Sequence, residues 1–155
     1  MKRGLLVLVV AAALPLLAAD PPGFVIWSSA ELKGYGQKLA PKMNDKKLAS
    51  EQLAKFGNHL TMIAHREADG EAEVHDTQAD LFVVQNGAAT LVIGGEVVDG
   101  RSTGPGETRA PSLKGGTKHA IAAGDVVHIP AKIPHQLLIP AGKKFDYFVV
   151  KVDTP

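Results

Sequence analysis

Short runs of alternating apolar residues follow one another from Asn58 to the end of the chain, and Gly and Pro separate them. Alternation with a period of two is typical of half-buried strands, and Gly and Pro mark the turns between strands. The predicted strands are 59–67, 72–75, 81–84, 89–93, 119–121, 126–129, 136–139 and 145–152. This pattern predicts an all-β domain, either a sandwich or a barrel.

A short helical arm is expected before the strands. Ser28 and Ser29 can cap a helix that runs toward Leu39 and ends at Pro41, although Gly34 and Gly36 weaken this prediction. A second helical segment is predicted from Ser50 to Phe56, where Ser50 also provides a capping signal.

The first 19 residues have the pattern of a secretory signal peptide. Lys2 and Arg3 precede an apolar run that ends in Ala18 and Ala19. The alternative is an uncleaved anchor, but the run is shorter than the roughly 20 residues that span a bilayer. We therefore expect a secreted or periplasmic protein that is cleaved after Ala19 and has no stable membrane insertion afterwards. The chain contains no cysteine, so no disulfide or lipid-modified cysteine is expected.

The mature chain would be a single domain of about 136 residues with 15 basic and 16 acidic side chains. This balance argues against a nucleic-acid partner. The predicted organisation is a signal peptide at 1–19, an N-terminal arm with short helices at 20–57, and a β-barrel at 58–155.

Two segments concentrate the residues that can bind a metal. The first, at 73–87, reads EVHDTQADLFVVQNG, and the second, at 124–135, reads GDVVHIPAKIPH. Residues two apart on a strand point to the same side, so Glu73 and His75 can converge on one ion. Asp80 begins another apolar run, and His135 follows a proline turn after the strand 126–129.

These segments resemble the two motifs of the cupin superfamily, over roughly residues 58–152. Glu73 stands at the first His of motif one, His75 at the second, Asp80 at the Glu, and Gly87 closes the motif. Gly124, Pro130 and His135 match motif two, whereas Lys132 replaces its second Gly and Ile139 replaces its Asn. The resemblance implies a double-stranded β-helix, or jelly-roll, barrel.

The same resemblance implies one divalent metal ion, with Glu73, His75, Asp80 and His135 as its ligands. Two imidazoles and two carboxylates suit Mn, Fe, Ni or Zn. Because Glu73 replaces a His, the site should favour oxygen-preferring metals more than the usual cupin set does.

Other assignments remain open. A second alignment makes His75 the first ligand and Thr77 the second, but its spacing before Asp80 is too short. Gln78 is a candidate substitute ligand or ligand contact. A cupin barrel that persists without metal is a further alternative.

The remaining histidines are candidates for chemistry or for structure. His59 and His65 share a strand face and could act as acid/base catalysts if that face lines the barrel. His128 is a candidate for a hydrogen bond to a ligand carboxylate, and His119 is expected at the periphery. Arg66 alternates with His65 and is expected to face solvent.

A long segment, 88–123, separates the motifs. Its centre, 99–112, is rich in Gly and Pro and predicts a lid, a binding loop or a mobile insertion. Arg101 and Arg109 in this segment would suit an anionic ligand, or would simply be solvated.

Two classes of function follow for a small-molecule ligand. The first is a metal-dependent enzyme such as a dioxygenase, lyase or isomerase, and the second is a non-catalytic protein that binds a sugar, carboxylate or metal. A storage-type protein has less support. If the aromatic run from Phe145 lay on a sheet edge it would be exposed, and a homodimer or the N-terminal arm would then cover it.

Overall fold

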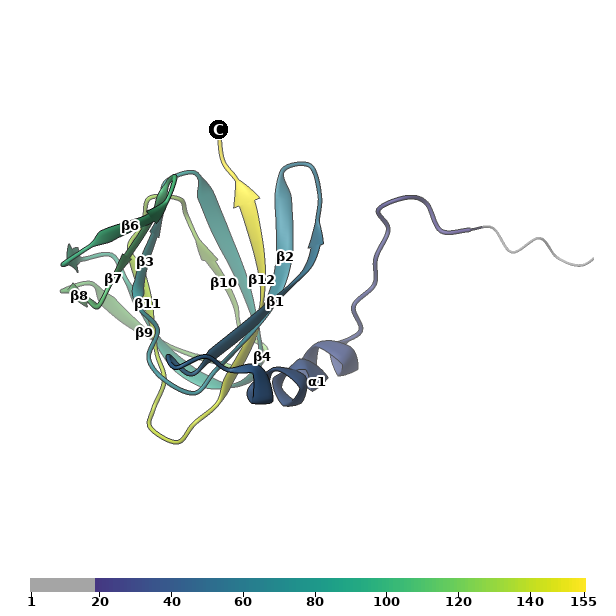
Figure 1. Ribbon diagram of the computed structural model, residues 1–155, viewed down its shortest axis with the longest axis horizontal. Helices are drawn as coiled ribbons and strands as arrows, with labels where there is room; N and C mark the ends of the chain where they lie inside the picture. Colours follow the sequence, from purple (N-terminus) through teal and green to yellow (C-terminus); the bar gives the residue numbers. More distant parts are fainter. Residues whose placement is uncertain (1–18) are drawn as a thin grey trace, which may run out of the picture.

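The protein is a curled antiparallel β-structure with one helix packed outside it (Figure 1). The structure is a computed structural model that describes residues 19–155, so the predicted signal peptide, apart from Ala19, lies outside the described residues. Two sheets lie on opposite sides of the barrel, and every strand pairing is antiparallel.

The first sheet has five strands. Its order is β1 (Leu48–Lys55), β2 (His59–Arg66), β12 (Phe145–Asp153), the first half of β4 (Gln78–Ile93) and β10 (Val126–Ile129).

The second sheet has six strands. Its order is β9 (Thr117–Ala122), the second half of β4, β11 (His135–Leu138), β3 (Ala72–His75), β7 (Glu107–Ala110) and β6 (Arg101–Gly104). A separate pair joins β5 (Glu96–Val98) to β8 (Ser112–Lys114).

Strand β4 belongs to both sheets and bends where it passes from one to the other. The register against β12 shifts between Asp146 and Tyr147, beside Gly87. Gly87 has a φ of 80°, and a Cβ there would overlap the carbonyl oxygen of Lys144. Only glycine combines this backbone conformation with such a close approach of two chains. The glycine that ends the first motif is therefore required by the bend.

The core fills the space between the sheets with apolar side chains of alternating strand positions. Phe82 and Val84 from β4 meet Tyr147 and Val149 from β12, and Leu137 from β11 closes the layer. Burial of such side chains contributes about 1.5–3 kcal/mol each. Because Asp80 is in phase with Phe82, the same strand also directs a carboxylate into the barrel.

Helix α1 (Ser29–Leu39) packs on the outer face of the first sheet (Figure 1). Ser28 caps it by accepting a hydrogen bond from the backbone N–H of Glu31, and a 3₁₀ turn at Ala40–Lys42 contains Pro41. Leu32, Tyr35 and Leu39 lie on one stripe of the helix and pack against Ile63 of β2. The prediction of this helix is confirmed.

Two predictions of local structure are wrong. Residues 50–56 were expected to be helical, but Leu48–Lys55 forms β1, because pairing along β2 outweighs the local capping signal. The segment 99–112 was expected to be an irregular loop, but it contains β6, β7 and the start of β8. The predicted strands 81–84 and 89–93 are the two halves of β4.

The aromatic C-terminal run lies inside the first sheet rather than at its edge. β12 pairs with β2 on one side and with β4 on the other. The expected edge exposure therefore does not arise.

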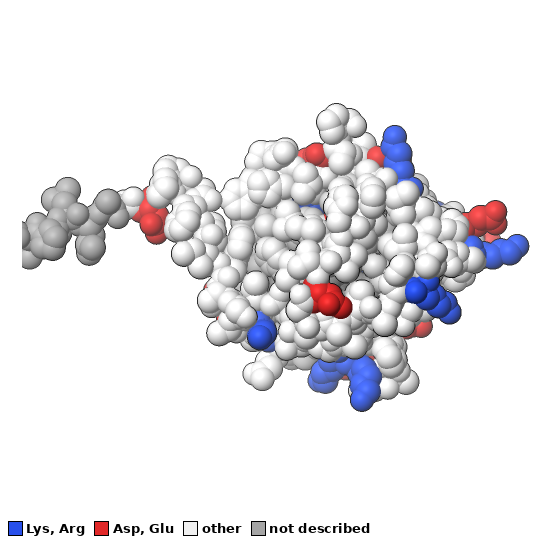
Figure 2. Space-filling view, turned by 180° about the vertical axis from the view of Figure 1, so that it is seen from behind, with Lys and Arg blue, Asp and Glu red and all other residues white. Residues whose placement is uncertain are grey.

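Within residues 19–155, no helix is long and apolar enough to cross a membrane. On the face turned away from the view of Figure 1, charges of both signs are scattered (Figure 2).

The close approach of α1 to β12 gives a sharp test of the packing. A Cβ at Gly36 would overlap the carboxylate of Asp146, which is buried and lies 2.5 Å from Nδ1 of His65. At Gly34, two residues earlier in the same helix, a Cβ would meet no atom within 4 Å. We expect Gly36→Ala to lower the free energy of unfolding by about 1–3 kcal/mol through overpacking.

Gly34→Ala is the matched control and should raise the free energy of unfolding by up to about 1 kcal/mol through helix propensity. Urea denaturation of both variants measures the two effects. Equal stabilisation by both substitutions would show that α1 does not pack on Asp146 as described.

Candidate metal centre

Strand register brings the charged residues of the second sheet into two rows. In the first row, Glu73 of β3 lies opposite His135 of β11 on one side and opposite Arg109 of β7 on the other. In the second row, His75 lies opposite Glu107. Directly opposite side chains on neighbouring strands contact each other. The cluster is thus a direct consequence of how β11, β3 and β7 pair.

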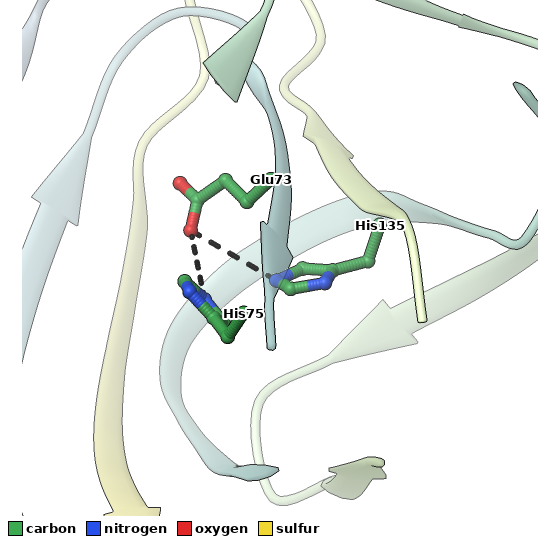
Figure 3. Close-up of side chains that lie close together, drawn as sticks. All are labelled: Glu73, His75 and His135. Carbon is green, nitrogen blue, oxygen red and sulfur yellow. Dashed lines mark ion pairs between the residues drawn. The ribbon is translucent and has the colours of Figure 1, made fainter. Parts of the chain in front are cut away.

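Glu73, His75 and His135 converge on one point inside the barrel (Figure 3). Glu73 Oε2 lies 3.5 Å from His75 Nε2 and 3.9 Å from His135 Nε2. Asp80 arrives from the first sheet, with Oδ2 at 3.3 Å from His75 Nε2 and 3.8 Å from His135 Nε2. The structure therefore brings together all four residues that were predicted as metal ligands.

Both imidazoles are oriented as metal-binding histidines usually are. Nδ1 of His135 donates to the carbonyl of Ile133 at 3.1 Å, and Nδ1 of His75 lies 2.8 Å from both carboxylate oxygens of Glu107. Such partners fix the ring so that Nε2 turns to the metal.

Nε2 of His135 is buried and has no hydrogen-bond partner within the described residues. A buried polar atom without a partner is costly, and such an atom needs an explanation. Two imidazole nitrogens and two carboxylates are a donor set for a divalent ion. These residues therefore fit the divalent metal ion that the two motifs imply.

Positive side chains surround the same carboxylates. Nζ of Lys151 lies 2.7 Å from Oδ1 and 3.0 Å from Oδ2 of Asp80, its direct cross-strand partner. Arg109 pairs with Glu73 through its NH1 group, and Arg66 donates to Glu73 at 3.4 Å and to the hydroxyl of Tyr147 at 3.0 Å. Each buried carboxylate thus has a cation as well as an imidazole beside it.

The electrostatics separate the two histidines. Burial favours a neutral Glu73, but His75, Arg109, His135 and Arg66 outweigh it and lower the pKa of Glu73 to about 2. Burial also opposes the charge on His75, yet Asp80 and Glu73 raise its pKa to about 9. For His135 burial prevails and lowers the pKa. His135 is therefore neutral at pH 7, with a lone pair on Nε2.

The other candidate ligands lie elsewhere. Thr77 is exposed in the turn after β3, and Gln78 donates to Asp153 at 2.7 Å. His119 and His128 are exposed on β9 and β10. The alignment that begins at Glu73 thus agrees with the structure, whereas the alternative through Thr77 does not.

His59 and His65 were candidate acid/base catalysts on the condition that their strand face lines the barrel, and that condition is not met. Alternate residues of β2, Met62, Ala64 and Arg66, line the cavity beside Glu73, whereas Ile63 and its face of the strand pack against α1. His65 contacts Asp146 at 2.5 Å and Glu67 at 3.2 Å. His59 stacks on Phe56. Neither is placed to act on a ligand of the metal.

Arg66 was expected to face solvent, but it is buried inside the barrel. Sequence reasoning also missed Lys151, Glu107 and Tyr147. Strand phase contained the signal, since Tyr147, Val149 and Lys151 alternate along β12 and Met62, Ala64 and Arg66 alternate along β2.

The two departures from the second motif have different consequences. Lys132 stands where the motif has Gly and keeps a left-handed backbone, with a φ of 66°. Its N–H donates to the carbonyl of His75 at 2.7 Å, so the turn still holds the ligand strand. A non-glycine residue in this conformation costs roughly 1–2 kcal/mol. Ile139, in place of Asn, is buried in the barrel core.

Two hollows meet at the cluster. A cavity of about 120 Å³ lies inside the barrel, and its charged lining residues are Arg66, Glu73, Asp80, Arg109 and Lys151, with Ser50 and Tyr147 as further polar residues. A wider cleft of about 680 Å³ opens next to it and shares Arg66, Glu73 and Arg109 as wall residues. A small molecule in the cleft would therefore contact the same charged side chains.

Solved structures share this arrangement of strands. An uncharacterized protein with a double-stranded β-helix domain from Klebsiella pneumoniae matches with a TM-score of 0.56 and 13% identity, over 83% of this chain and 89% of that chain. The chain has the cupin fold. The cupin domain of Cnp3 from Schizosaccharomyces pombe matches with a TM-score of 0.53 and 9% identity, over 73% of this chain and 70% of that chain.

A cupin-2 domain protein from Rhodospirillum rubrum matches with a TM-score of 0.51 and 14% identity, over 69% of this chain and 60% of that chain. No sequence-family description and no curated protein matches the chain. At these identities the similarity concerns the fold, and the function must be argued from the residues of the site.

The low pKa of Glu73 predicts how the EDTA-treated protein responds to acid. A carboxylate whose pKa falls on folding stabilises the protein above its unfolded pKa of about 4.5, and this contribution is lost as the pH falls toward 2. We expect Glu73→Gln to be less stable than the wild type at pH 6 by at most about 3 kcal/mol. The difference should shrink steadily between pH 4.5 and 2.

Urea denaturation at a series of pH values measures this difference. Glu51→Gln is the control, because Glu51 is exposed and its ion pair with Lys42 is long, at 3.7 Å. This substitution should change the free energy of unfolding little at every pH. A Glu73→Gln difference that is independent of pH would show that Glu73 is not ionised within a cluster of cations.

Proposed function

We propose that this chain is an exported metal-binding cupin whose barrel binds a small molecule at one divalent ion and acts on it as an enzyme. The unpartnered Nε2 of His135, directed at Glu73 and Asp80, is the observation that carries this proposal. Export rests on the signal-peptide pattern of residues 1–19. Dioxygenase-, lyase- and isomerase-type reactions are all compatible with the site.

The protein supplies the ligands and fixes their direction. Glu73, His75, Asp80 and His135 would hold the ion, and Glu107 and the Ile133 carbonyl keep the two imidazoles turned toward it. A bound ion would supply Lewis-acid or redox activation. Phe82 and Tyr147 form an aromatic floor beside His135 and limit the access of water from the core side.

The substrate would enter through the wider cleft. Arg109 lies between this cleft and the barrel cavity and is less than one-third exposed, so it can contact a ligand from either side. Arg66 donates to Tyr147 and Glu73 and thereby holds both side chains in place. These contacts give the cavity a fixed polar wall that faces an entering ligand.

A non-catalytic binding protein is the second candidate. Arginine and lysine side chains already balance the charges of Glu73 and Asp80. The barrel could therefore keep these buried carboxylates for ligand binding, without catalysis. Metal analysis of the exported protein separates the two candidates. A stoichiometric redox metal favours an enzyme, and a metal-poor protein that retains an organic ligand favours binding alone.

Removal of His135 tests the ligand set. We expect His135→Ala to weaken zinc binding by more than about 100-fold, because even outer partners of metal ligands contribute 10–100-fold. Far-UV circular dichroism should be unchanged, since His135 lies at the start of β11. Isothermal titration calorimetry with EDTA-treated protein measures the affinity.

His119→Ala is the control, because His119 is exposed on β9. It should leave zinc affinity within twofold of the wild type. Zinc binding that survives His135→Ala but is lost in His119→Ala would place the metal on the surface and contradict the proposal.

A further inference from the structure

Lys151 contacts the proposed metal ligands His75 and Asp80, and its position is hard to combine with a bound ion. Its Nζ lies 3.0 Å from His75 Nε2, and both carboxylate oxygens of Asp80 are within 3.0 Å. The side chain is only 15% exposed. The ammonium therefore reaches the barrel interior and contacts two of the four proposed ligands at once.

A metal ion would need the atoms that Lys151 contacts. In the neutral imidazole, Nε2 of His75 has a single lone pair, and it serves either a hydrogen bond from Lys151 or a bond to a metal ion. Both oxygens of Asp80 also accept hydrogen bonds from the ammonium. Contact of Lys151 with Nε2 of His75 and coordination of a metal ion by that nitrogen are therefore mutually exclusive.

We propose that the ammonium of Lys151 occupies the metal position when no ion is bound and that a divalent ion displaces it. The displaced ammonium then binds a small carboxylate ligand of the metal. The inference rests on the proposed metal site and adds a competitor and a ligand class to it. The long unbranched side chain of lysine allows both positions, because its charge sits at the end of a flexible stem.

Charge counting supports the second half of the proposal. Three carboxylates, Glu73, Asp80 and Glu107, lie in the cluster. Arg66, Arg109 and Lys151 supply three positive charges beside them. A metal ion binds an imidazole in its neutral form, so a divalent ion that displaces Lys151 leaves two positive charges in excess.

Excess positive charge in a confined cavity favours an anionic ligand. The barrel cavity of about 120 Å³ is lined by Arg109 as well as Lys151. A water molecule takes about 30 Å³, so this volume suits a group of a few heavy atoms such as a carboxylate. The rest of a larger ligand would extend into the adjoining cleft.

Lys151→Met tests both halves of the proposal, because it should raise zinc affinity and reduce the response to a carboxylate. In protein purified after export and treated with EDTA, we expect the substitution to raise zinc affinity about 10-fold or more, because a charge-assisted competitor is removed. With zinc bound, 50 mM acetate should raise the melting temperature of the wild type more than that of Lys151→Met. Acetamide, a neutral molecule of the same shape, should raise neither.

Lys144→Met is the matched control, because Lys144 is 66% exposed and pairs with Glu67. It should leave zinc affinity and the acetate response unchanged. Lys151→Gln keeps a donor for Asp80 without the charge and replaces the Met variant if that one does not fold. It should also increase zinc affinity.

Each outcome decides a separate point. Unchanged or weaker zinc binding in the Lys151 variants, with a wild type that binds zinc, overturns the inference alone. Tighter zinc binding with an unaltered acetate response overturns its ligand half. Zinc binding that appears only in the Lys151 variants supports the competitor role. If no variant binds zinc, the proposed function fails together with the inference.

Discussion

Strand β4 is the constraint on which the rest of the structure depends, because it belongs to both sheets. Its first half carries Asp80 next to β12, and its second half pairs with β11, which carries His135. The bend at Gly87 therefore sets how the two sheets face each other. Without it, Asp80 from one sheet and Glu73, His75 and His135 from the other would not meet. The same backbone feature that closes the barrel assembles the site.

The concentration of charge inside the barrel is the second theme. Isolated buried carboxylates are costly, and each one here is accompanied by a cation or an imidazole. Glu73 lies between Arg66 and Arg109, and Asp80 lies against Lys151. This arrangement differs from a site made only of metal ligands, because it contains its own compensating cations. The carboxylates are thus held in place by groups of the protein itself.

Sequence reasoning could predict the parts of the fold and site that depend on local pattern. Glu73, His75, Asp80 and His135 follow motif spacing, and Ser28 begins the helix through a local cap. Residues whose role depends on pairing were missed. Lys151 reaches Asp80 only because β12 pairs with β4, and β1 is a strand only because it pairs with β2. Arg66 was assigned to the wrong face, since alternation gives the phase of a strand but not which face is inside.

The most direct test of the account is anomalous X-ray scattering from crystals of the zinc-loaded protein. The account predicts a single strong peak inside the barrel, within about 2.0–2.2 Å of the Nε2 atoms of His75 and His135 and of at least one carboxylate oxygen of Glu73 or Asp80. A zinc peak at the surface histidines His119 or His128, with an ordered barrel interior that binds no ion, would contradict it.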